Sequence, residues 1–95
     1  MIHILAKITA QPASAQAVRD ALVELVGHSR KEAGCVSYAL YQRGDDPALF
    51  QTVEEWRDAA AADAHMKTPH IGAALAKVGS LLAAPPEIVR FDKLT

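Results

Sequence analysis

Cysteine is nearly absent from this sequence, and no excess of positive charge is present. Cys35 is the only cysteine among the 95 residues, which excludes an intrachain disulfide and is typical of a protein from a reducing compartment. Ten lysines and arginines stand against 11 aspartates and glutamates, so the net charge is −1. Such a balance offers no basic surface for phosphates and therefore disfavours general nucleic-acid binding.

Long hydrophobic runs and phosphate-binding loops are missing as well. Charged residues interrupt every apolar stretch long enough to span a bilayer, and the first residues lack the basic start of a secretion signal. The sequence therefore predicts a soluble, cytoplasmic protein. It contains no Gly-x-Gly-x-x-Gly motif, no Walker loop and no Gly-x-Ser-x-Gly motif, which argues against nucleotide binding and against a hydrolase with a nucleophile elbow.

The pattern of apolar residues predicts four strands and three helical segments in one domain that covers residues 1–95. Apolar residues alternate with others in the predicted strands, which span 2–10, 35–42, 49–56 and 88–94. In the helical segments, apolar residues recur at helical spacing after the candidate caps Ser14, Asp58 and Thr68. Gly34 is suited to a left-handed turn after the first helix.

This order of elements, β-α-β-β-α-β with the second helix in two pieces, is that of a ferredoxin-like unit of the α+β class. Such a unit has a four-stranded antiparallel sheet with its helices on one face. The other face would carry Leu5, Tyr41 and Val53 among polar neighbours, and an open apolar face on a small domain implies a partner. We expect two copies to form a homodimer through these sheet faces; coverage by long Lys and Arg side chains is the alternative.

Groups suited to acid–base chemistry gather at the end of the third strand and on the second helical region. Histidine can take a proton from a phenol near neutral pH, so His65 is a candidate base. Trp56 offers a flat wall for an aromatic ligand, although packing in the core explains it equally well. Glu54 and Glu55 point in opposite directions on a strand, so at most one of them faces a given cavity. The structural alternatives are a helix-end role for His65 and sheet packing for Tyr38.

A metal site is not predicted. His65 and His70 lie five residues apart on either side of Pro69, so they do not share a helix face as ligands at i and i+4 do. They can meet only through the tertiary fold. Cys35 begins a strand and not a helix, which leaves its thiolate without a stabilising dipole, and we expect it to be a small buried residue.

Several motifs together resemble the antibiotic biosynthesis monooxygenase (ABM) family, and within it the small quinol monooxygenase-like proteins. They are the turn and strand of residues 32–41, Glu55-Trp56 at a strand end, and a helical segment that reads His65-x-x-Thr68-x-His70. The resemblance extends over about residues 4–94. It implies a dimeric α+β barrel in which each protomer holds a pocket between its helices and its sheet.

The resemblance also implies an activity, the oxidation of a small quinol or polyphenol by O₂ without flavin, haem or metal. In this interpretation His65 abstracts or orients the phenol proton and Tyr38 contributes a hydrogen bond. Trp56, His70 and Glu54 are expected to bind the substrate. Because O₂ is a triplet, such an enzyme has to deprotonate its substrate and exclude water, after which the anion itself can pass an electron to O₂.

The chain departs from the family pattern in containing no asparagine. Haem-degrading members use an Asn-Trp-His set, so haem degradation is not expected, although Trp56 and His65 are present. A non-catalytic dimeric α+β barrel that binds a small molecule or serves in a stress response is an alternative, because fold alone does not decide function. An RNA-binding domain with the same element order is disfavoured because the third strand ends in acidic residues.

Overall fold

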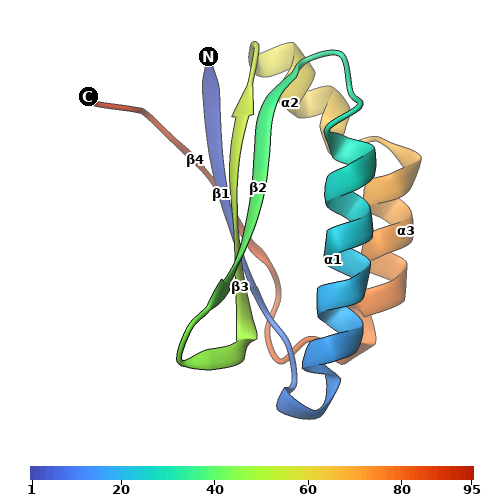
Figure 1. Ribbon diagram of the computed structural model, residues 1–95. Coiled ribbons are helices and arrows are strands. Elements are labelled where there is room, and N and C mark those ends of the chain that lie inside the picture. The colour runs from blue at the N-terminus through green and yellow to red at the C-terminus, as the bar shows by residue number, and fades with distance from the viewer.

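The structure, a computed structural model, describes residues 1–95. Its four strands form one antiparallel sheet in the order β2-β3-β1-β4, and its helices cover one face of that sheet (Figure 1). The predicted ferredoxin-like α+β fold is thus confirmed. No helix combines the length and the apolar character that crossing a membrane requires. The elements are β1 (Ile2–Thr9), α1 (Ala15–Ser29), β2 (Cys35–Arg43), β3 (Asp46–Trp56), α2 (Ala59–His65), α3 (Pro69–Val78) and β4 (Glu87–Phe91).

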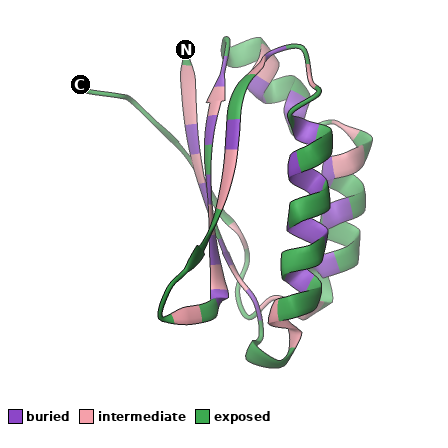
Figure 2. Cartoon of the chain, in the orientation of Figure 1, coloured by how far each residue is buried: buried purple, intermediate pink, exposed green.

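Alternation along the strands turns every second side chain toward the helices. In β1, Ile4 and Ile8 are buried while Lys7 is exposed, and in β3 Phe50 and Trp56 are buried. Figure 2 shows that the buried parts of the helices face the sheet. The apolar core lies in this layer, and removal of its side chains from water supplies the main driving force for folding.

The buried layer has an apolar end and a more polar end. Most of the core forms one cluster that joins β1 and β3 to α1 and α3 and includes Ile8, Phe50, Val18, Leu22 and Val78. A second, smaller cluster near α2 consists of Ile4, Val26, Tyr38, Trp56 and Ala62. Three buried polar side chains, those of Thr52, Glu54 and His65, come from β3 and α2.

Two of the three predicted helix caps are confirmed. The carboxylate of Asp58 accepts a hydrogen bond from the backbone N–H of Ala61 at 2.8 Å, and the hydroxyl of Thr68 accepts one from Ile71 at 3.4 Å. Ser14 makes no capping bond, because it ends a short 3₁₀ turn that leads directly into α1. Pro69, in the first turn of α3, makes the chain start a new helix there.

Gly34 serves a close approach and not the predicted left-handed turn. No glycine of the chain has a positive φ. A Cβ on Gly34 would instead lie 2.2 Å from the Cβ of Ala61 in α2, which is far inside van der Waals contact. The carbonyl of Gly34 also accepts a hydrogen bond from the backbone N–H of Arg57 at 2.9 Å. Gly34 therefore allows the segment before β2 to lie directly against α2.

Candidate active site

His65 is the last residue of α2, and its side chain is buried between the helices and the sheet with only 2% of its surface exposed. Its Nδ1 lies 2.6 Å from Oε2 of Glu32, and its Nε2 lies 3.9 Å from Oε1 of Glu54. The indole ring of Trp56 packs against the imidazole with ring centroids 4.4 Å apart. The two carboxylates stabilise the positive charge that the imidazole acquires when it takes up a proton.

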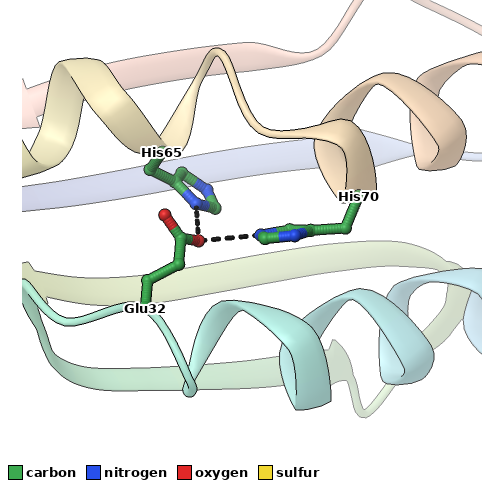
Figure 3. A group of neighbouring side chains, drawn as sticks. All are labelled: Glu32, His65 and His70. Atoms are coloured by element: carbon green, nitrogen blue, oxygen red, sulfur yellow. Dashed lines mark hydrogen bonds and ion pairs between the residues drawn. The ribbon is translucent and has the colours of Figure 1, made fainter.

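Glu32 is a residue of the candidate site that the sequence did not single out. It lies in the turn between α1 and β2, and its Oε2 is also 2.8 Å from Nε2 of His70. Side chains from three segments of the chain thus meet at one carboxylate oxygen (Figure 3). In the sequence, Glu32 was noted only as the first residue of the run 32–41, which resembles the ABM family.

Glu54 is the glutamate of the pair that points inward, and it is only 3% exposed. Glu55 belongs to the opposite face of β3, so the prediction that only one of the two faces the cavity is confirmed. The carboxylate of Glu54 accepts hydrogen bonds from the hydroxyl of Thr52 at 2.6 Å and from the indole N–H of Trp56 at 3.0 Å. These two donors offset part of the cost of burying the carboxylate.

Tyr38 faces the same region from β2. It is 4% exposed, and its ring centroid lies 5.7 Å from that of His65. Burial of the phenol, and next the negative charge of Glu54, raise the pKa of Tyr38 far above its usual value. The phenol therefore keeps its proton across the physiological range, and a hydrogen bond to the carboxylate of Glu54 contributes to this.

A cavity opens beside these groups. Its polar lining is confined to Tyr38, Thr52, Glu54 and His65, and it contains no lysine or arginine. The space that the centres of water molecules can occupy inside the cavity is about 60 Å³. This is room for roughly four to six waters. Such a site suits a small, flat and uncharged ligand. The apolar lining includes Ile8, Leu22, Leu25, Ile71, Val78 and Ile88.

Two predicted substrate-binding residues lie outside this cavity. Trp56 is completely buried and is not part of the wall of this cavity; it packs against His65 and donates a hydrogen bond to Glu54. The side chain of His70 is 20% exposed. Its ring stacks on that of His28, with centroids 5.7 Å apart, and borders a separate groove on the surface.

The family profile described as antibiotic biosynthesis monooxygenase matches residues 1–77. The chain belongs to the ABM family. The protein named "Putative monooxygenase YcnE" from Bacillus subtilis is 34% identical over 92 residues, which cover 97% of either chain. The Escherichia coli K12 protein named "Probable quinol monooxygenase YgiN" is 31% identical over 83 residues, covering 77% of this chain and 80% of that protein.

A solved structure shares the fold over nearly the whole chain. The crystal structure of PA3566 from Pseudomonas aeruginosa is 37% identical to this chain, covers 99% of it and 94% of its own chain, and has a TM-score of 0.92. ABM membership and the names of these relatives support a monooxygenase-like function and hence an oxidoreductase.

Proposed function

We propose that this protein is a monooxygenase that oxidises a small quinol or polyphenolic substrate with O₂ and needs no flavin, haem or metal to do so. One observation carries the proposal: a buried imidazole, that of His65, is fixed by Glu32 and borders a cavity with mostly apolar walls. This arrangement supplies a base, a dry environment and room for a small ring.

The contact with Glu32 supports a separate role for each nitrogen of His65. A carboxylate only accepts hydrogen bonds, so the 2.6 Å contact places the proton of the neutral imidazole on Nδ1. Nε2 is then unprotonated and lies on the side of Glu54, in the polar part of the cavity. In this state Nε2 can take the proton of a phenol, and both carboxylates stabilise the imidazolium that results.

Deprotonation makes the substrate electron-rich enough to react with O₂ directly. The phenolate passes one electron to O₂, and the phenoxyl radical and superoxide combine at a ring carbon that bears hydrogen. The peroxide anion takes back the proton held by His65, and loss of water across the C–H and O–O bonds leaves one oxygen atom on the ring as a quinone carbonyl. The apolar walls keep bulk water away from the anion and the radical pair.

Tyr38 and Glu54 suit a substrate with two hydroxyl groups. The protonated phenol of Tyr38 can donate to the oxygen that becomes negative, whereas the carboxylate of Glu54 can accept from a second hydroxyl. A base, a donor and an acceptor around one small cavity match a quinol. The name of the relative YgiN, a probable quinol monooxygenase, points to the same substrate class.

Oxygen uptake by EDTA-treated protein with a panel of hydroquinones and polyphenols tests the proposal. His65→Ala should lower quinol-dependent uptake at least about tenfold, the low end of what a positioned acid–base group contributes. His3→Ala, which removes a histidine from the strand β1 and not from the cavity, is the matched control. Uptake by His65→Ala at the wild-type rate would remove His65 from the mechanism. Ligand binding without uptake in the wild type would favour the non-catalytic alternative.

We further propose that the protein is a homodimer joined through the open faces of two sheets. Neighbouring strands place Ala39, Val53, Leu5 and Val89 in one apolar row across this face. Val53 and Val89 are 40% and 48% exposed in the single chain, and such a row on a small domain implies a partner. Light scattering after size-exclusion chromatography should show a dimer for the wild type and a monomer for Val53→Glu. A wild-type monomer at micromolar concentration would contradict the dimer.

A further inference from the structure

We propose that Glu32, His65 and His70 form a binding site for one divalent transition-metal ion of the zinc class. Oε2 of Glu32 lies 2.6 Å from Nδ1 of His65 and 2.8 Å from Nε2 of His70. The candidate ligand atoms of the three residues all lie within 4.8 Å of one another, and the side chains converge from three segments (Figure 3). Metal binding at this cluster is separate from the proposed reaction, which uses no metal.

The chemistry of the three ligands selects the ion. Two imidazoles and one carboxylate are a typical donor set for zinc and related ions, whereas Mg²⁺ and Ca²⁺ prefer oxygen ligands. Three protein ligands leave a fourth position for water. Tetrahedral bonds of about 2.1 Å place ligand atoms roughly 3.4 Å apart, so the Glu32 oxygen has to withdraw by roughly 0.8 Å from the ring of His65 and roughly 0.6 Å from that of His70. Glu32 lies in a turn and not in a helix or strand, which allows this shift.

Both imidazole rings are held by contacts that do not involve the carboxylate. His65 packs against Trp56 at a centroid distance of 4.4 Å, and His70 stacks on His28 at 5.7 Å with an angle of 20° between the ring planes. The hydroxyl of Thr68 donates to the carbonyl of His65 at 2.8 Å and accepts from the first turn of α3, which fixes the link between the two histidines. Rings that are already oriented lose little freedom when an ion binds.

The electrostatics of the cluster favour a cation. The side chains of Glu32 and Glu54 are only 15% and 4% exposed, and their ion pairs are with histidines and not with any lysine or arginine. Buried carboxylates without a cationic partner are costly, and a metal ion compensates their charge. With Nδ1 of His65 on the metal, its Nε2 carries the proton and lies 3.9 Å from Glu54. At this distance Glu54 acts on the ring through its negative charge and not through a hydrogen bond.

An ion can also reach the cluster from solvent. His70 is partly exposed and borders a surface groove that is also lined by Glu24, His28 and Lys77, of which Lys77 is paired with Glu24 at 3.4 Å. A site with one ligand at a groove and another in the buried layer has both an entry path and a fixed geometry, and a metal site needs both.

Calorimetric titration of EDTA-treated protein with ZnCl₂ at neutral pH tests this proposal. We expect one Zn²⁺ per chain, and a loss of affinity of at least about tenfold in Glu32→Gln and in His70→Ala. Co²⁺ should show the visible absorption of an ion held by nitrogen and oxygen ligands at low coordination number, and both substitutions should abolish it. Glu55→Gln, which changes a carboxylate on the open face of β3, and His3→Ala are the matched controls and should bind as the wild type does.

Two results would overturn the metal site. One is no binding by the wild type at millimolar Zn²⁺, and the other is binding that is equally tight in Glu32→Gln and His70→Ala. Circular dichroism of the metal-free variants establishes that they are folded, and if Glu32→Gln does not fold, the partly exposed His70 decides. A failure leaves the proposed function intact, because oxygen uptake is measured without metal. If both proposals hold, Zn²⁺ suppresses uptake, because Nε2 of His65 then keeps its proton.

Discussion

The two faces of the sheet come from the same strands but carry different chemistry. In β3, Phe50 and Glu54 lie under the helices and are 2% and 3% exposed, whereas Val53, on the face without helices, is 40% exposed. Because side chains alternate along a strand, nearly every residue of the covered face has a sequence neighbour on the open one. Glu54 and Glu55 show what this means: they are the same residue type, but only Glu54 is buried among hydrogen-bond donors beside His65.

The covered face holds the fold together and carries the candidate site, whereas the open face carries the apolar row through which we propose that two copies pair. Pairs of neighbouring residues, one from each face, therefore provide internal controls. These paired variants are all made in the Val53→Glu background. In that background the open face is expected to stay exposed to water, because Val53→Glu is expected to prevent pairing with a second copy.

The largest effect is expected at the apolar end of the covered face. Phe50 belongs to the main core cluster and is 2% exposed, so Phe50→Ala should lower the free energy of unfolding by about 3–5 kcal/mol. Its neighbour Gln51→Ala, on the open face, should change that energy by less than about 0.5 kcal/mol. Urea denaturation followed by circular dichroism measures both values. Equal losses would show that the two faces do not differ in their contribution to stability.

Much of this fold can be predicted from the sequence because its rules are local. Strand alternation and helical spacing depend on residues that are close in the chain, and so do the caps at Asp58 and Thr68. Gly34 shows where such local rules fail. The reason for a glycine there is the Cβ of Ala61 in α2, which becomes a neighbour only in the folded chain, so the sequence alone led to a left-handed turn instead.

A smaller effect is expected from the adjacent glutamates. In Glu54→Gln, one carbonyl oxygen and one amide group replace two carboxylate oxygens, each of which accepts a hydrogen bond from Thr52 or Trp56. One buried donor therefore loses its acceptor, at a cost of about 1–3 kcal/mol. Quinol-dependent oxygen uptake should fall too, because a charge beside His65 is lost.

Glu55→Gln is the matched change on the open face, and it should alter neither the stability nor the rate of oxygen uptake. Thermal melting and an oxygen electrode measure the two properties. If Glu54→Gln is as stable and as active as Glu55→Gln, the carboxylate of Glu54 contributes neither to stability nor to oxygen uptake.

The candidate site can be predicted from the sequence only in part. His65, Tyr38 and Glu54 belong to local motifs, and all three line the cavity. The role of Glu32 depends on how the turn after α1 packs against the link between α2 and α3, and no periodicity relates position 32 to His65 or His70. The spacing of the two histidines excludes a common helix face, but Pro69 starts a new helix and lets both rings reach the same oxygen.

The smallest effect is expected for the two tyrosines of β2, and it should be absent at neutral pH. Tyr38 lies on the covered face and is 4% exposed, whereas Tyr41 is 59% exposed. Burial and the charge of Glu54 raise the pKa of Tyr38. In Tyr41→Phe, Tyr38 is the only tyrosine of the chain, so this variant should show no tyrosinate absorbance near pH of about 10 while it remains folded. Ionisation of Tyr38 near that pH in the folded variant would contradict its burial.

The raised pKa of Tyr38 also predicts how the free energy of unfolding changes with pH. The pKa of Tyr38 is higher in the folded than in the unfolded chain, so above pH of about 10 the unfolded chain binds fewer protons than the folded one. The free energy of unfolding is therefore unaffected by Tyr38 at neutral pH and falls as the pH rises beyond that point. Urea denaturation between neutral and alkaline pH should show a weaker alkaline loss of stability in Tyr38→Phe than in the wild type, because Tyr38 has to be exposed before it can ionise, and an equal loss would contradict this role of Tyr38.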